Sequence, residues 1–200
     1  MDKQVVEVLA AYEARIAAER SGIGQTDPDG RDMRMRAIGP DAGRFLNILV
    51  RSLEAPVVLE IGTSFGHSTI WLAEAAQAAN GRLITMEQLD YKSTYARDMA
   101  VKAGLGDAVD FQVGDALDLI ARLPFKLDFV FLDLWKDLYV PCLDLFYEKL
   151  NPGALIVADN MIRPGGDNIR AYARALREKP GIETVLLPVG TGFEVSRFIG

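Results

Sequence analysis

The sequence predicts a single α/β domain: a doubly wound, mostly parallel seven-stranded sheet with one antiparallel edge strand. Short apolar runs alternate with segments of helical periodicity, which is typical of a parallel sheet covered on both faces. The chain closes on two apolar runs separated by the Gly-Thr-Gly turn 190–192, and strands joined by so short a turn pair antiparallel. A chain of 200 residues is long enough for one such domain.

The first 40 residues precede the predicted sheet. Apolar residues recur at helical spacing over 3–20, which predicts an amphipathic helix. Residues 22–40 contain several Gly, Asp and Met residues and are interpreted as a loop. A second helix is expected over 41–53, before Pro56. Because the sheet does not require residues 1–40, we expect them either to cap the substrate pocket or to form a dimer surface.

Strands and helices alternate after Pro56. The predicted strands are 57–61, 83–87, 109–113, 127–132, 154–158, 184–187 and 193–199. The predicted helices are 68–79, 91–103, 117–123, 140–150 and 169–178. The sequence contains no repeat, low-complexity tract or second domain, so one domain is expected to span 1–200.

Composition and charge exclude several classes of protein. The net charge of -6 argues against electrostatic binding of nucleic acid. No apolar run approaches the ~20 residues of a membrane-spanning helix, and the N-terminus lacks the pattern of a signal peptide. Cys142 is the only cysteine, which favours a reducing, cytoplasmic location. His67 is the only histidine, which excludes His-rich metal sites. We expect it to pack near the glycine turn described below.

Polar residues follow two of the most apolar predicted strands. Asp133 follows 127–132, and Asp159 and Asn160 follow 154–158. The carboxyl ends of parallel strands meet at one rim, where ligands of such sheets bind. These side chains offer oxygen ligands only, which suits Mg²⁺ or Ca²⁺ better than zinc. The alternative is that both aspartates are helix N-caps.

A glycine turn follows the first predicted strand. Glu60 precedes Gly62 and Gly66 in a Gly-x-x-x-Gly spacing, which differs from the Gly-x-Gly-x-x-Gly of a dinucleotide site. The glycines let the backbone approach a ligand, and the following helix presents free N–H groups. An acidic residue here suits the ammonium and sulfonium of S-adenosylmethionine better than a pyrophosphate. The alternative is a tight turn that binds no ligand.

Two further acidic residues end neighbouring strands. Glu87 lies about twenty residues beyond the glycine turn, where a carboxylate can accept both hydroxyls of a ribose; otherwise it is a solvated side chain. Asp115 follows the third strand. It could hold the adenine of the methyl donor or cap the next helix, and the two roles are compatible.

From about Met33 to Gly200 the chain resembles class I S-adenosylmethionine-dependent O-methyltransferases of the metal-dependent catechol O-methyltransferase type. The most specific stretches are 132–139 and 158–165. The resemblance implies a Rossmann-like methyltransferase fold, a divalent cation such as Mg²⁺ on Asp133, Asp159 and Asn160, and Lys136 as the catalytic base. The positions it implies at the methyl donor are Ile38, Glu60, Gly62, Ser68, Glu87, Ala116 and Asp133.

Other positions concern the acceptor and the pocket wall. Glu194 matches a glutamate that binds a catechol hydroxyl in the animal enzymes, although a glutamate near a sheet edge is often only solvated. Trp135 is expected either to stack on the adenine of the donor or to lie in the core. Three residues depart from the animal relatives: Leu134 replaces a histidine near the adenine, and Arg36 and Ala42 replace a methionine and a lysine.

The predicted reaction is transfer of a methyl group to one hydroxyl of a small catechol held on Mg²⁺. Three protein oxygens leave about three positions of a six-coordinate Mg²⁺, enough for two catechol oxygens and one water. Lys136 follows Asp133 by one helical turn, close to the cation, although a solvated lysine is the alternative. The loop after Asn160 is shorter than in plant relatives that methylate caffeoyl-coenzyme A, which favours a small free catechol.

Several alternatives stay open at this point. The acceptor could be a caffeoyl-coenzyme A-like ester or a tRNA base, and the chain could be an NAD-dependent oxidoreductase or a non-catalytic protein that binds S-adenosylmethionine. A homodimer is compatible with the sequence. The sequence does not determine the acceptor, the hydroxyl that is methylated, the metal or the oligomeric state.

Overall fold

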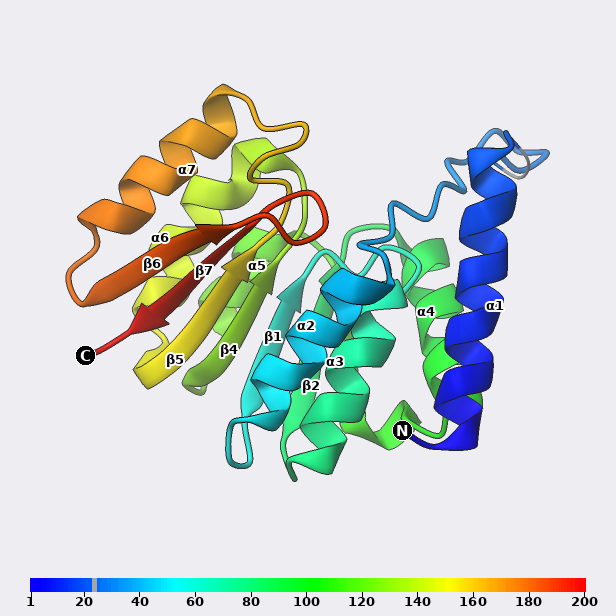
Figure 1. The fold of residues 1–200 in the computed structure, drawn as a ribbon, viewed down its shortest axis with the longest axis horizontal. Coiled ribbons are helices and arrows are strands. Elements are labelled where there is room, and N and C mark those ends of the chain that lie inside the picture. Colours follow the sequence, from blue (N-terminus) through cyan, green and yellow to red (C-terminus); the bar gives the residue numbers. More distant parts are fainter. Residues whose placement is uncertain (23–24) are drawn as a thin grey trace.

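The computed structural model describes residues 1–22 and 25–200 and contains a seven-stranded sheet of order β3-β2-β1-β4-β5-β7-β6 (Figure 1). The strands are β1 (Val57–Ile61), β2 (Arg82–Glu87), β3 (Val109–Val113), β4 (Leu127–Leu132), β5 (Leu150–Ala158), β6 (Ile182–Leu187) and β7 (Phe193–Phe198). The chain starts the sheet near its centre at β1 and builds outward in both directions, so the predicted doubly wound fold is confirmed.

The first five strands are parallel, and the C-terminal hairpin supplies the antiparallel pairing. The reversed strand is β7, which pairs antiparallel with both β5 and β6. The tight turn before β7 returns the chain into the space beside β5, so β7 lies one place in from the edge and β6 forms the edge itself.

Helices cover both faces of the sheet. They are α1 (Lys3–Arg20), α2 (Pro40–Arg51), α3 (His67–Ala78), α4 (Asp90–Lys102), α5 (Ala116–Arg122), α6 (Tyr139–Tyr147) and α7 (Asp167–Glu178), with short 3₁₀ helices at Gly106–Ala108 and Lys136–Leu138. Helices α2–α4 pack on one face, with α1 outside them against α3 and α4, and α5–α7 pack on the other. Figure 1 shows α1 and α7 at opposite ends of the molecule.

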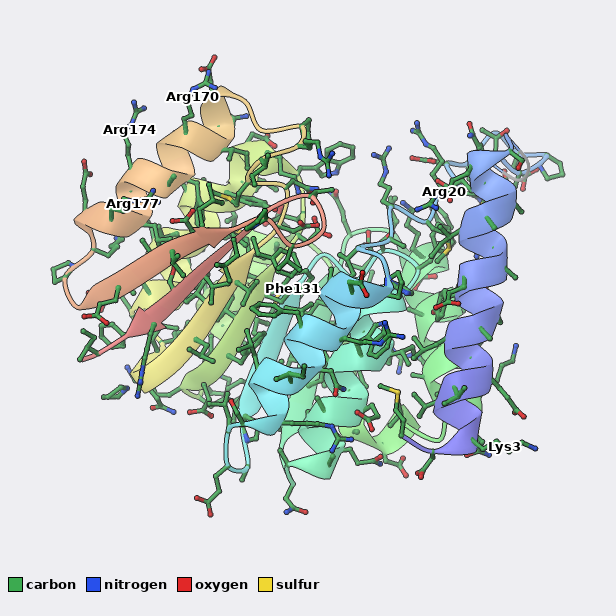
Figure 2. All side chains as sticks on the ribbon, in the orientation of Figure 1. Lys3, Arg20, Phe131, Arg170, Arg174 and Arg177 are labelled. Carbon is green, nitrogen blue, oxygen red and sulfur yellow. The ribbon has the colours of Figure 1, made fainter. Side chains whose placement is uncertain are left out.

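Side-chain alternation along the central strands gives each helical layer its own core. Phe129 and Phe131 of β4 are fully buried on the α1–α4 side, and Phe131 lies near the centre of the molecule (Figure 2). Val130 and Leu132 point to the other side, where they pack with Tyr139 and its neighbours. The continuous apolar runs that predicted central strands therefore reflect burial on both faces.

Two predicted segments need comment. The predicted helix 140–150 ends earlier, and β5 begins at Leu150 and not at 154, because Leu150 pairs with Leu127 of β4 and continues the sheet. The predicted loop 22–40 includes residues 23–24, which lie outside the described residues. In the described part of that loop, Thr26 and Asp32 form an isolated β-bridge.

Within the described residues, no helix combines the length and apolarity needed to cross a membrane.

Candidate active site

The register of the sheet brings Asp133 and Asp159 to one rim. Ile61 of β1 pairs with Leu132 of β4, and Leu132 pairs with Ala158 of β5, so the next residue of each strand emerges at the same level. The backbone N–H of Asp133 donates to the carbonyl of Ile61, and that of Asp159 to the carbonyl of Leu132, each at 3.0 Å. The proximity predicted for the two aspartates is therefore present.

Lys136 lies directly beside Asp133. Its Nζ donates to Asp133 Oδ1 at 3.0 Å, to the Leu134 carbonyl at 2.8 Å and to the Tyr139 hydroxyl at 2.8 Å. The Tyr139 side chain is fully buried, and its hydroxyl lies within 3.1 Å of the Leu132 and Asp159 carbonyls. The amine is thus fixed at the rim, with 22% of the lysine side chain exposed.

The charges at this rim are unbalanced. Burial raises the pKa of the Asp133 carboxyl, while Lys136 and Arg36 lower it. Burial, with a smaller contribution from Asp133, raises the pKa of Asp159 to about 6. Two largely buried carboxylates thus share one lysine, and a cation held between them would favour their charged forms. The oxygen donors present fit a hard divalent ion.

Asn160 is positioned by the turn before β7. It adopts a left-handed backbone conformation with φ of 61°. Its backbone N–H donates to Asp159 Oδ1 at 2.6 Å, and its side-chain amide donates to the Thr191 hydroxyl at 2.9 Å. Thr191 also bonds Asp159 Oδ1. The sequence identified Thr191 only as part of a turn and did not identify Tyr139, since neither residue has a signature apart from its position in space.

Metal binding by Asp133, Asp159 and Asn160 stays a prediction. Within the part of the chain that the structure describes, no three or more His, Cys, Asp or Glu side chains cluster in a way that could hold a metal ion. The predicted set differs from such a cluster because its third member is an amide. Two carboxylates and one amide are nonetheless a donor set suited to Mg²⁺.

The glycine turn after β1 needs glycine for a steric reason. Gly62 has φ of +110°, and a Cβ there would lie 2.2 Å from the Asp133 carbonyl oxygen. Gly66 has φ of +87°, and a Cβ would lie 2.7 Å from the Ala96 Cβ. The contact at Gly62 packs the glycine turn against Asp133. The predicted binding region for the methyl donor and the predicted metal site therefore lie next to each other.

Glu60 is buried beneath this turn with one oxygen free. Its Oε2 accepts hydrogen bonds from the hydroxyls of Thr69 and Thr85, each at 2.6 Å, while Oε1 has no partner among the described residues. Burial raises the Glu60 pKa to about 7, while the Ser68, Thr69 and Thr85 hydroxyls lower it. A buried acceptor without a donor fits a ligand ammonium group, which would satisfy it.

Glu87 and Asp115 both have local partners. Glu87 accepts the Ser64 N–H at 2.8 Å and the Leu89 N–H at 3.0 Å, so it lies against the glycine turn. Asp115 accepts the N–H groups of Leu117 and Asp118 and caps α5, which confirms the N-cap interpretation. Contacts of Glu87 with a ribose and of Asp115 with an adenine stay predictions.

The remaining predicted positions vary in exposure. Ile38 and Ser68 are buried, and Ala116 opens α5 in a half-buried position. His67 is buried with its ring edge-on to Tyr12, at 5.7 Å between ring centroids, which confirms that it packs near the turn. Trp135 is 65% exposed, so the core interpretation of this residue is wrong.

The Glu194 backbone lies beside the end of β5, but its carboxylate is bound by residues of α7 and β6. It pairs with Ala158 across β5 and β7, but its buried carboxylate accepts hydrogen bonds from Arg177 of α7 and, at 2.9 Å, from Thr184 of β6. Figure 2 shows Arg177 on α7, on the helical layer opposite to α1–α4. Side-chain alternation along β7 directs Glu194 away from the layer that Phe193 joins. In this structure the carboxylate forms an ion pair with Arg177, and the catechol contact that the resemblance implied stays a prediction.

Helix α1 and the loop after it contact the glycine turn. The Tyr12 hydroxyl donates to the Phe65 carbonyl at 2.5 Å. The Arg15 guanidinium lies 4.3 Å from the Phe65 ring centroid and donates to the Met33 carbonyl at 2.9 Å. Glu19 accepts the Met35 N–H at 2.6 Å. The N-terminal segment is therefore part of the wall of this region, while its capping and dimer roles stay predictions.

Comparison with known proteins gives the family. The O-methyltransferase family profile matches residues 11–199. A catechol O-methyltransferase of Niastella koreensis is 38% identical over 135 residues, which are 64% of this chain and 60% of that protein. A catechol O-methyltransferase of Mycobacterium tuberculosis is 36% identical over 176 residues, 81% of this chain and 79% of that protein.

A solved structure agrees with the sequence relatives. The O-methyltransferase TomG from Streptomyces achromogenes, which was solved in complex with S-adenosylmethionine, has a TM-score of 0.79 and 27% identity. The superposition covers 100% of this chain and 91% of TomG. With the profile and the Mycobacterium relative, this places the chain in the O-methyltransferase family, a class I S-adenosylmethionine-dependent family.

Proposed function

We propose that this protein transfers the methyl group of S-adenosylmethionine to one hydroxyl of a small catechol-type acceptor bound on a divalent cation such as Mg²⁺. The observation that carries the proposal is the position of Lys136 Nζ, 3.0 Å from Asp133 and next to the buried Asp159. An amine beside an oxygen-donor site can deprotonate an acceptor held there.

The donor would lie between the glycine turn and the ends of β1 and β2. The free Oε1 of Glu60 would accept the ammonium of the methionyl group. Glu87 would accept the ribose hydroxyls at the end of β2. The absence of a side chain at Gly62 lets the backbone approach the ligand closely. These contacts position the methyl group, and positioning is a large part of catalysis in a bimolecular transfer.

Asp133, Asp159 and Asn160 would hold the cation. A bound divalent ion lowers the pKa of a phenol and fixes the orientation of its oxygen. Lys136 would take the hydroxyl proton at Nζ, while the Leu134 carbonyl and the Tyr139 hydroxyl hold the amine in place. The exposed Trp135 ring would border the acceptor or the adenine of the donor.

The test is a methylation assay of 1,2-dihydroxybenzene with the purified chain, with Mg²⁺ and with a chelator. We expect turnover only with the metal, and loss of turnover in Asp159→Ala. Asp118→Ala is the matched control, because Asp118 is an exposed residue of α5 whose ion-pair partner within the described residues is Arg122, at 3.8 Å. Full turnover in the presence of chelator would overturn the metal-dependent proposal.

A further inference from the structure

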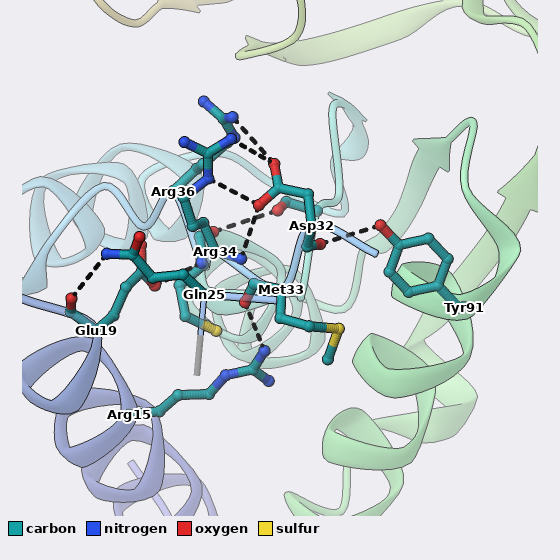
Figure 3. Close-up of polar contacts among 10 residues, drawn as sticks. Arg15, Glu19, Gln25, Asp32, Met33, Arg34, Arg36 and Tyr91 are labelled. Carbon is teal, nitrogen blue, oxygen red and sulfur yellow. Dashed lines mark hydrogen bonds and ion pairs between the residues drawn. The ribbon is translucent and has the colours of Figure 1, made fainter. Parts of the chain in front are cut away.

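The segment Asp32–Arg36, here called the arginine strap, carries two guanidinium groups on one carboxylate (Figure 3). Arg34 binds Asp32 through two donors, Nε at 2.8 Å and Nη2 at 3.0 Å. Arg36 contributes one donor, Nη2, at 3.1 Å. The Arg34 side chain holds the pKa of Asp32 well below its usual range, so Asp32 stays charged. The strap therefore has one positive charge in excess.

The Arg36 side chain lies against Trp135, beside the proposed active site. Its guanidinium carbon lies 5.4 Å from the ring centroid of Trp135, the exposed residue that immediately precedes Lys136. A positive group beside Trp135, the residue before Lys136, can pair with an anionic substituent of an acceptor held at Lys136.

Most of the hydrogen-bonding capacity of Arg36 is available. A guanidinium has five N–H donors. Among the described residues, the Arg36 guanidinium donates one side-chain hydrogen bond, which goes to Asp32. The side chain is 45% exposed, so a ligand can reach it. Guanidinium groups bind carboxylates through paired hydrogen bonds.

The strap is held from several directions. The Tyr91 hydroxyl donates to the Asp32 carbonyl at 3.0 Å, and Glu19 accepts the Met35 N–H (Figure 3). The Ser64 hydroxyl of the glycine turn donates to the Met35 carbonyl at 3.2 Å. Arg36 itself adopts a left-handed conformation with φ of 48°, which L residues rarely adopt without support from their surroundings. A group fixed in this way loses little freedom when it binds a ligand.

We propose that Arg36, held between Asp32 and Trp135, selects catechol acceptors that carry a carboxylate. The inference rests on the proposed function, because it assigns the substrate class of the same site. The carboxylate of the acceptor pairs with the free edge of the Arg36 guanidinium while the two hydroxyls face Lys136 and the metal ligands.

The experiment compares kcat/KM for 3,4-dihydroxybenzoate with that for 1,2-dihydroxybenzene, which lacks the carboxylate. In Arg36→Gln we expect the ratio of the two values to fall about fivefold, mainly through KM, as for a partly exposed ion pair. Arg36→Lys should restore only part of the ratio, because it keeps the charge but loses the paired hydrogen bonds of the guanidinium. Arg44→Gln is the control, since it removes the same charge from an exposed residue of α2 that pairs with Asp41.

The outcomes separate this inference from the proposed function. An unchanged ratio in Arg36→Gln, or an equal fall in Arg44→Gln, would overturn the role of Arg36 while methylation of 1,2-dihydroxybenzene still supports the proposed function. If the wild-type chain with Mg²⁺ methylates neither compound, the proposed function is overturned and the inference with it. Added salt should raise KM for 3,4-dihydroxybenzoate more than for 1,2-dihydroxybenzene, because salt screens the pair.

Discussion

Lys136 Nζ lies 3.0 Å from Oδ1 of Asp133, three residues earlier in the chain. The short distance arises because Asp133 is tied to β1 through the Ile61 carbonyl, while Lys136 opens a 3₁₀ helix that turns its side chain back to the strand end. The proposed base and a proposed metal ligand are therefore one unit, and a change at either residue acts on both.

Replacing Lys136 with Met should lower kcat by about 10²–10⁴-fold, the usual contribution of a general base. The methylene stem is kept, but Asp133 loses its ion-pair partner, so the donor affinity is measured as well to separate loss of the base from a disturbed site. Methylation of 1,2-dihydroxybenzene gives kcat, and calorimetric titration with S-adenosylhomocysteine gives the donor affinity. Turnover within about threefold of wild type would argue against Lys136 as the base, since general-base catalysis contributes far more than that.

Replacing Glu60 with Gln should change how stability depends on pH in the ligand-free chain. Folding raises the Glu60 pKa from 4.5 to about 7 because the carboxyl is buried. The folded chain thus binds this proton more tightly than the unfolded chain does. The contribution of Glu60 to the free energy of unfolding is therefore complete below pH 4.5 and is lost as the pH rises through 7. The loss is on the order of 3 kcal/mol.

The measurement for Glu60 is urea unfolding of the wild type and of Glu60→Gln between pH 5 and 8. The difference between the two proteins isolates Glu60 from Asp159, whose pKa is also raised. The wild type should lose stability relative to the variant as the pH rises. Parallel curves for the two proteins would show that Glu60 ionises normally in the folded chain.

Replacing Gly62 with Ala should destabilise the chain and disrupt the donor site. The new Cβ would lie 2.2 Å from the backbone of Asp133, and φ is +110°. Gly30→Ala is the matched control, because Gly30 has φ of +79° and nothing within 4 Å of its Cβ position. It should cost only about 1–2 kcal/mol from the backbone conformation. Thermal unfolding should show the larger loss in Gly62→Ala, and equal losses would contradict the steric account.

Replacing Glu194 with Gln should lower stability and leave catalysis intact. The carboxylate is buried and bound by Arg177 and Thr184, so losing its charge should cost about 1–3 kcal/mol of unfolding free energy. Thermal unfolding gives the stability, and kcat/KM for 1,2-dihydroxybenzene gives the activity. A large fall in kcat with unchanged stability would restore the catalytic interpretation of this residue.

The sequence predicted the strands of the sheet well because burial on both faces leaves long apolar runs such as Phe129–Leu132. It also predicted that Asp133 and Asp159 would share a rim, since strand ends are in register in a parallel sheet. The match to the O-methyltransferase family profile removes the basis for the NAD-dependent oxidoreductase alternative.

Other predictions were corrected or left open, and they concern side-chain direction, exposure and one helix boundary. Trp135 was compatible with the core by composition, but it lies after the strand end and is 65% exposed. Glu194 was assigned by resemblance, and the alternation of β7 directs it to Arg177. The helix boundary near Leu150 shifted because pairing with Leu127 extends β5. For Glu194 and for the helix boundary, a contact with a distant segment decided the outcome.

The sequence by itself determined the class of fold, the order of its elements and the residue types available for chemistry, because local periodicity and strand-end composition encode these. Only the tertiary structure decided which of those residues meet. It brought Lys136 to Asp133 and Tyr139, and it placed Arg36 over Trp135. It also left one buried oxygen of Glu60 without a hydrogen-bond partner among the described residues. These contacts depend on strand register, on the face of the sheet to which a side chain points and on burial. All three result from packing between segments that lie far apart in the chain.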